Sequence, residues 1–191
     1  MPPRRRLTPD ERRGQLLDVG AELFAERPYD EVLMEQVAER AGVSRALLYR
    51  HFPAKRDLFA AIYERSAEQR LTEAALDPAL PLPERLAAAL DTHIDYFAAN
   101  RHTVLAANRT LAGDRTIQAI MATHHARLRD QLLDTTGLTD TERAATSAVL
   151  LSWLVFVHVL CVEWLERENF SRAELRDACV GALLGALSHG R

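Results

Sequence analysis

Residues 34–52 read Met-Glu-Gln-Val-Ala-Glu-Arg-Ala-Gly-Val-Ser-Arg-Ala-Leu-Leu-Tyr-Arg-His-Phe, and their order sets the architecture of the N-terminal part. Apolar residues recur at helical spacing on both sides of Gly42, which predicts a helix, a short turn and a second helix. Gly42 suits the left-handed conformation that ends the first helix, and Ser44 suits the cap of the second. Leu48 and Phe52, four residues apart, are expected to face inward.

The outward side of the second helix carries Arg45, Ala46, Tyr49 and Arg50. An arginine in the first turn of such a helix reaches base edges in the major groove, where it can bond guanine with two hydrogen bonds. Just beyond, Lys55 stands at the start of the next helix, where free amides favour an anion. These residue types predict a DNA-reading face. The alternative is an exposed basic hairpin with no nucleic-acid role.

The overall charge of the chain argues against a uniformly basic nucleic-acid coat protein. The 191 residues carry a formal net charge of −3. Hydrophobic residues make up 48% of the chain and charged residues 27%, a composition that excludes disorder as the main state. Residues 45–56, however, contain four basic residues and no acidic one. Residues 1–70 hold 13 basic and 12 acidic residues, and the remainder holds 11 and 15. The basic character is therefore a narrow stripe on an otherwise acidic chain.

The apolar periodicity and the cap signals predict an all-α protein of about nine helices, with no sheet. The expected helices cover residues 9–25, 32–40, 44–51, 55–75, 83–100, 102–112, 114–134, 140–166 and 172–188. Capping boxes are expected at Thr8…Glu11, Thr139…Glu142 and Ser171…Glu174. Three prolines between residues 78 and 83 make a rigid connection, so we expect a three-helix domain over 1–70 and a larger helical bundle over 71–191.

A longer pattern surrounds the helical hairpin. It consists of Ala21 and Phe24, then residues 37–44, then residues 48–58, and it closely resembles the DNA-binding domain of the TetR family of bacterial transcriptional regulators. The resemblance implies that the remaining helices form a dimer interface and an effector pocket. By position it implies DNA contacts at Ser44, Arg45, Ala46, Tyr49, His51 and Lys55. We add Arg50 because of its charge and outward direction.

One departure from the family concerns the start of its second helix, where members often have Thr or Ser to contact phosphate. Here residues 30–34 read Asp-Glu-Val-Leu-Met, without a hydroxyl. We expect Asp30 to cap the helix. The missing phosphate contact is then expected from Tyr29 or from a basic arm at residues 1–6; a frayed tail is the alternative for that arm.

The segment from Ala144 to Val162 has 19 residues without a charge, close to the length that spans a bilayer. It contains four polar residues and lacks a flanking basic cluster, which favours burial within a protein or between subunits over a membrane. Gly181 and Gly185, four apart, permit close helix approach, between subunits or within one chain. We therefore expect a homodimer through the last two helices. Its two recognition helices would read a palindromic operator on double-stranded DNA, roughly 34–36 Å apart.

The effector pocket is implied by the resemblance, and polar or aromatic residues on mostly apolar helices are its candidates. Each of them alone also suits a satisfied place in the core. The candidates are His93, Tyr96, Phe97, Asn100, Asn108, His124, Trp153, Phe156 and His158. A metal-sensing variant would use three of these histidines with Cys161.

An enzyme is not expected, because the chain has no His-Glu-x-x-His, no Cys-x-x-Cys, no phosphate loop and no nucleophile elbow. We expect no cofactor and no metal. Two cysteines and no secretory signal indicate a reducing compartment, the cytoplasm. The sequence thus predicts a homodimeric repressor that a small-molecule effector releases from its operator. A helical adaptor that does not bind DNA is the competing class.

Overall fold

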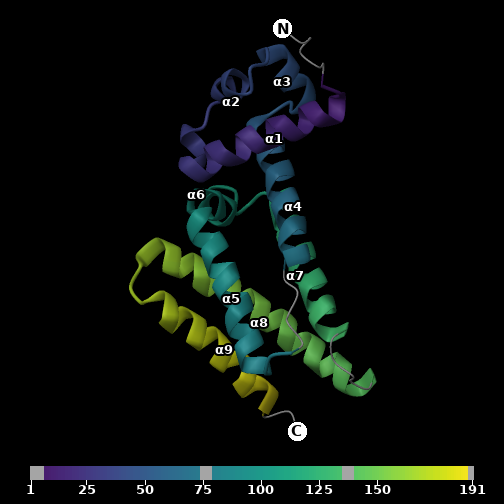
Figure 1. Ribbon diagram of the computed structural model, residues 1–191, viewed down its shortest axis with the longest axis vertical. Coiled ribbons are helices and arrows are strands. Elements are labelled where there is room, and N and C mark those ends of the chain that lie inside the picture. The colour runs from purple at the N-terminus through teal and green to yellow at the C-terminus, as the bar shows by residue number, and fades with distance from the viewer. Residues whose placement is uncertain (1–6, 74–78, 135–139, 189–191) are drawn as a thin grey trace.

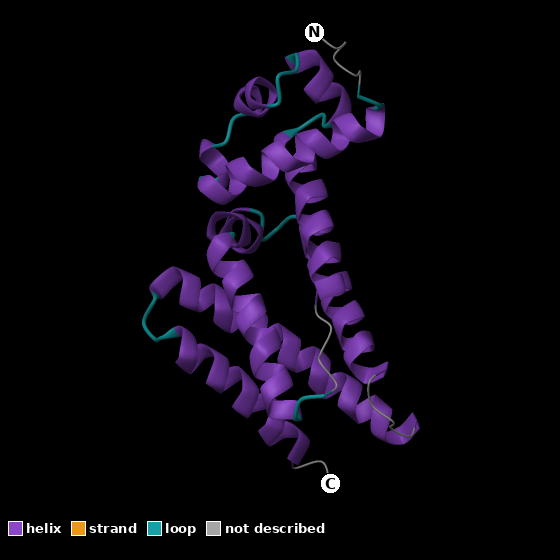
Figure 2. Ribbon diagram, viewed as in Figure 1, coloured by secondary structure: helices purple, strands orange, loops and turns teal. Residues whose placement is uncertain are grey.

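The fold was analysed on a computed structural model, which describes residues 7–73, 79–134 and 140–188. Within these ranges it contains nine α-helices and no strand (Figure 2), so the all-α expectation is confirmed. A short 3-10 turn covers Tyr29–Glu31, and a π-helical segment covers Ala106–Thr110. The α-helices are α1 Pro9–Glu26, α2 Met34–Arg40, α3 Arg45–His51, α4 Lys55–Glu73, α5 Leu82–Ala99, α6 Arg101–Leu105, α7 Arg115–Asp134, α8 Asp140–Arg167 and α9 Arg172–Ser188.

Side-chain caps fix the starts of α1 and α9. The Glu11 N–H donates to the Thr8 hydroxyl at 3.2 Å, and the Glu11 carboxylate accepts from the Thr8 N–H at 2.8 Å. Ser171 and Glu174 make the same reciprocal pair at 3.2 and 2.7 Å. Both predicted capping boxes are confirmed, and each satisfies backbone donors that a helix start leaves unpaired. The third, at Thr139…Glu142, and the arm at residues 1–6 lie outside the described residues.

Two local expectations were wrong. The second helix begins at Met34 because Asp30 belongs to the 3-10 turn, and the Gln36 amide oxygen instead accepts from the Leu33 N–H at 3.0 Å. Residues 102–112 are not one regular helix. The Leu111 N–H bonds the Ala106 carbonyl five residues back, at 2.8 Å, which makes the segment a π-helix.

The described helices pack around two hydrophobic cores (Figure 1). The N-terminal core lies among α1–α4, and it also takes in Ala106, Ala107 and Ile117 from beyond residue 100. The second core lies among α5–α9. Helix α4 contributes to the N-terminal core with its first half and continues down toward the second (Figure 1). The domain division at residue 70 stays a prediction, and α4 is the element that would cross it.

Helix α8 carries more apolar side chains than it buries in the single chain. Its segment Arg143–Arg167 is long and apolar enough to cross a membrane by length and composition, yet only 22% of its apolar window is buried. Its inner side packs on α5, α7 and α9. Its outer side exposes Val155 (45%), Phe156 (42%) and Val159 (59%), so a continuous apolar face remains uncovered in the single chain.

Candidate nucleic-acid interface and ligand cavity

The turn between α2 and α3 has the geometry that a helix-turn-helix requires. Gly42 adopts φ +65°, and the Val43 N–H bonds the Ala38 carbonyl at 2.9 Å, which closes α2. The Ser44 hydroxyl accepts from the Leu47 N–H at 3.2 Å, which starts α3. The Gln15 amide donates to the Ala41 carbonyl at 3.1 Å, so α1 holds the turn in place.

The inner and outer sides of α3 are as expected. Leu48 and Phe52 are buried at 0% and 2% exposure, and burying each such side chain stabilises the domain by about 1.5–3 kcal/mol. The predicted DNA contacts Ser44, Arg45, Ala46, Tyr49 and Arg50 are all exposed, and His51 is half-buried. A rigid helix therefore presents two arginines, a tyrosine and a small apolar residue on one free face. Their DNA contacts stay predictions.

Arg45, a predicted base contact, has 70% of its side chain accessible. One Nη atom lies 3.5 Å from the Glu35 carboxylate on α2. At that distance and exposure the attraction is weak, so it guides the side chain without holding it. A guanine edge can replace Glu35 as the partner of Arg45.

Only part of the basic stripe at residues 45–56 is free of contacts within the protein. The Lys55 ammonium donates to the Tyr29 and Val32 carbonyls at 2.9 and 3.1 Å, and it lies 4.4 Å from the centre of the Tyr29 ring. Arg56 pairs with Asp114 at the start of α7 and donates to the Thr116 hydroxyl at 2.8 Å. Two of the four charges thus also hold the domain together, which composition alone does not reveal.

Tyr29 was expected to replace a missing phosphate contact. Its half-buried ring stacks on Phe24 and meets Phe59 edge-on, with centroids 5.7 and 5.4 Å away. Burial raises the pKa of the Tyr29 hydroxyl. The ring is therefore a packing element of the N-terminal core, and its phosphate contact stays a prediction.

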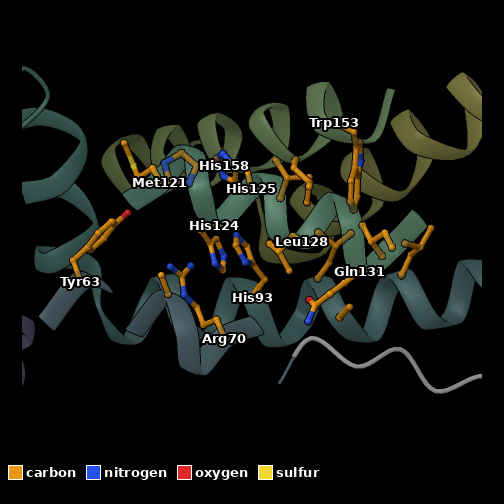
Figure 3. Close-up of a pocket in the computed structure, with 17 residues that line it drawn as sticks. Tyr63, Arg70, His93, Met121, His124, His125, Leu128, Gln131, Trp153 and His158 are labelled. Carbon is orange, nitrogen blue, oxygen red and sulfur yellow. The ribbon is translucent and has the colours of Figure 1, made fainter. Parts of the chain in front are cut away.

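A second candidate site is a cavity of about 190 Å³ among α4, α5, α7 and α8. Its wall holds four of the nine predicted pocket residues, His93, His124, Trp153 and His158. Figure 3 shows these side chains converging from different helices. Of the polar and aromatic residues that line it, Tyr63, Arg70, His125 and Gln131 were not predicted. Tyr63 and Arg70 were missed because they lie on α4, which was assigned to the DNA-binding domain.

The other five predicted pocket residues lie elsewhere. Phe97 is buried behind the wall, with its ring 4.4 Å from that of His93 and 5.6 Å from that of His158. Asn108, in the π-helical segment, lies with its side-chain amide oxygen Oδ1 at 2.8 Å, hydrogen-bond distance, from His158 Nε2. Tyr96 packs under the Arg70 guanidinium, and Asn100 bonds the Tyr96 carbonyl. Phe156 points to the outer side of α8.

The cavity keeps its four histidines neutral. Burial is the main cause: it lowers the pKa of His158 to about 4 and of His124 to about 3, and it also lowers those of His93 and His125. The positive charge of Arg70 acts in the same direction on all four. His93 Nε2 and His124 Nδ1 are buried without a hydrogen-bond partner. Among the described residues no His, Cys, Asp and Glu group has the arrangement of a metal site.

Comparison with known proteins gives these features a context. The sequence model described as "Bacterial regulatory proteins, tetR family" matches residues 16–62. The HTH-type transcriptional activator FasR of Mycolicibacterium smegmatis is 39% identical over 93 residues, which are 48% of this chain and 42% of that protein. The HTH-type transcriptional regulator AcrR of Shigella flexneri is 37% identical over 67 residues, 35% of this chain and 31% of that protein. The match thus spans less than half the length of either relative.

The fold agrees over a longer stretch. A crystal structure of a tetR-family transcriptional regulator from Streptomyces coelicolor superposes with a TM-score of 0.83 at 26% identity, covering 96% of this chain and 83% of that one. The exposed helix α3 and the cavity among α4, α5, α7 and α8 define the class of protein: a helix-turn-helix protein whose other helices enclose a cavity. The match at residues 16–62 and the shared fold then give the family of that part: residues 16–62 are a DNA-binding domain of the TetR family of bacterial transcriptional regulators, and the described helices have the fold of a tetR-family regulator.

Proposed function

We propose that this protein is a homodimeric, sequence-specific DNA-binding regulator that reads a palindromic operator and leaves it when a small molecule fills the cavity. The observation that carries the DNA-binding part is the outer face of α3. It presents Arg45, Ala46, Tyr49 and Arg50 free of the core, while Leu48 and Phe52 fix the helix from behind. Base readers need this combination of exposure and rigid support.

The dimer would form through α8 and α9. Support comes from the exposed apolar side of α8 at Val155, Phe156 and Val159, and from an open groove between the two helices. A Cβ placed at Gly181 would meet no atom within 4 Å, so there is open space beside this glycine among the described residues. A second copy would cover this face and bring two α3 helices to successive major grooves. Covering by a subunit, rather than by lipid, also suits a cytoplasmic protein without membrane attachment.

The control step would run through α4. Its first half belongs to the N-terminal core, whereas Ala67 and Arg70 in its second half line the cavity, and Tyr63 at its middle belongs to both. A ligand that prefers one position of α4 would shift the spacing of the two reading helices, because binding moves an equilibrium by its differential affinity. We propose repression as the outcome in the cell. The relative FasR is an activator, so a promoter assay is needed to distinguish repression from activation.

Selection of bound duplexes from a random DNA pool by the full chain tests the proposal. The expected product is an inverted repeat whose half-sites lie one helical turn apart. A reporter gene placed behind that sequence is expected to be less active when the protein is present. A pool without any enriched sequence would contradict DNA reading. An enriched single half-site would contradict the dimer, and a more active reporter would contradict repression.

A further inference from the structure

The cavity contains one charged side chain, Arg70, and no carboxylate among the described residues that line it. The Arg70 guanidinium lies 4.5 Å from the centre of the Tyr96 ring, and its Nε donates to the Ser66 carbonyl at 3.4 Å. Arg70 has no ion pair among the described residues, whereas arginines such as Arg40, Arg109 and Arg172 do. An unbalanced cation in a partly enclosed cavity attracts an anion.

The same part of the cavity holds unused hydrogen-bonding capacity. Figure 3 shows Arg70 beside His93 and His124. Each neutral imidazole has one N–H donor and one acceptor nitrogen, and one buried nitrogen of each ring lacks a partner. Leaving such atoms unpaired is costly, which favours a ligand that bonds them.

The wall away from Arg70 is largely apolar, with Gln131 as a polar member. Leu128 and Trp153 lie toward the other end of the cavity in Figure 3, away from Arg70. The leucines Leu86, Leu90, Leu132 and Leu154 also line the cavity. The indole N–H of Trp153 already donates to the Cys179 carbonyl at 2.8 Å, and the Gln131 amide donates to the Leu71 carbonyl at 3.3 Å, so this end offers the ligand mainly ring surface and methyl groups.

We propose that the effector is a small organic monocarboxylate with an apolar body, whose carboxylate binds Arg70 with help from His93 and His124. This inference rests on the proposed role of the cavity as the effector site. One negative charge balances the one cation, whereas a phosphate dianion would exceed it. Arg70 would repel a cationic ligand or a metal ion. The four neutral histidines can bond a carboxylate without adding charge of their own.

Calorimetric titration of the full chain with three ligands that share one alkyl chain tests the proposal: octanoate, octan-1-ol and octylamine. Octanoate is expected to bind about tenfold or more tightly than octan-1-ol, because a charge-assisted bond to a guanidinium is added. Octylamine is expected to bind weakest. Arg70→Met should weaken octanoate about tenfold or more and leave octan-1-ol unchanged, and the second result shows that the cavity is intact. Arg129→Met, on α7 and paired with Asp130, is the matched control and should change neither.

Equal binding of octanoate and octan-1-ol would overturn the proposal, and so would full octanoate affinity in Arg70→Met. Stabilisation by Zn²⁺ alone would overturn it in favour of a metal. If none of the three ligands binds, the ligand class is wrong while DNA reading by α3 is untouched. If octanoate binds through Arg70 but operator affinity does not change, the ligand class stands and the control function of the cavity is wrong.

Discussion

The ring of Tyr63 stacks on the ring of Phe59, with centroids 6.0 Å apart and planes inclined by 11°. Tyr63 lines the ligand cavity, and Phe59 lies fully buried in the N-terminal core. Phe59 in turn meets Phe24 and Tyr29 edge-on at 5.1 and 5.4 Å. A continuous series of aromatic contacts therefore joins the cavity wall to the core that supports α3. A closely packed series of this kind moves as a unit rather than deforming gradually.

The first prediction concerns this aromatic contact. Tyr63→Leu should weaken the effect of octanoate on operator affinity, since the flat contact with Phe59 is lost, whereas Tyr63→Phe should retain it. Coupling of this kind typically changes affinity by about 5- to 150-fold. Operator titrations with and without octanoate measure it in each variant. A Leu variant that responds as strongly as the wild type would show that the coupling takes another route.

The second prediction concerns Arg45. Arg45→Ala should weaken operator binding by about 1–3 kcal/mol and relax the preference at one base position, because a bidentate base contact is lost. Glu35→Gln should strengthen binding modestly, since the carboxylate 3.5 Å from Arg45 no longer competes with DNA. Affinities for single-base operator variants provide the measurement. An unchanged preference profile in Arg45→Ala would assign base reading to another residue.

The third prediction concerns the contact between α4 and α7. The side-chain hydrogen bond from Arg56, together with the Ile117 and Thr116 amides, lowers the pKa of Asp114 to about 2. A carboxylate with a lowered folded-state pKa stabilises the fold above its unfolded value of 3.8, and this stabilisation is lost as the pH falls toward 2. Asp114→Asn should therefore lower the melting temperature at neutral pH. Asp130→Asn, at an exposed pair with a neighbouring residue, is the control and should not. Equal melting temperatures for the two variants would contradict a structural role for Asp114.

The fourth prediction concerns the cavity histidines and pH. The pKa of His158 is about 4 in the folded chain against 6.5 for a free histidine, so the unfolded chain binds more protons between these values. Stability should fall as the pH drops from 6.5 to about 4, by up to about 1.4 kcal/mol per pH unit for this histidine. The groups that face His158 are the other cavity histidines and Arg70, with no carboxylate among the described wall residues. Denaturant unfolding of His158→Leu should show a shallower pH dependence, and an unchanged slope would contradict the buried neutral ring.

The fifth prediction concerns the dimer. Val159→Glu should produce a monomer, because a carboxylate at the most exposed apolar position of α8 would be buried unpaired between subunits. Ala122→Glu, at an exposed position on α7, should remain a dimer. Sedimentation equilibrium without detergent measures the mass of each. A wild-type chain that sediments as a monomer at micromolar concentration would remove the basis for a palindromic site.

Sequence reasoning predicted the elements well where local chemistry determines them. The Thr8 and Ser171 caps and the turn at Gly42 depend on neighbours within a few residues, so their patterns were sufficient. The π-helical segment was missed because an extra residue within a helix leaves no signature in apolar spacing. Asp30 failed as a cap because it belongs to the 3-10 turn, three residues before Leu33, the residue at the cap position, whose N–H donates to the Gln36 side chain instead.

The cavity was predicted less well than the reading face. Outward residues of α3 follow from the helical period of one short segment, whereas the cavity wall is assembled from four helices far apart in sequence. Tyr96 and Phe97 lie on the same helix as His93. A shift of about one residue along a helix turns a side chain from the cavity wall to the core behind it, and the sequence alone does not resolve that shift. The roles of Lys55 and Arg56 as structural ties were equally hidden, since their partners lie 23 to 60 residues away.

The reading of DNA by α3 is the central claim, and one titration tests it most directly. The affinity of the full chain is measured by fluorescence anisotropy for the selected operator and for a scrambled duplex of the same length and composition, over a range of salt concentrations. Binding to the operator should be about a thousandfold tighter or more, with the logarithm of affinity falling linearly with that of salt. Equal affinity for the two duplexes at every salt concentration would contradict the claim.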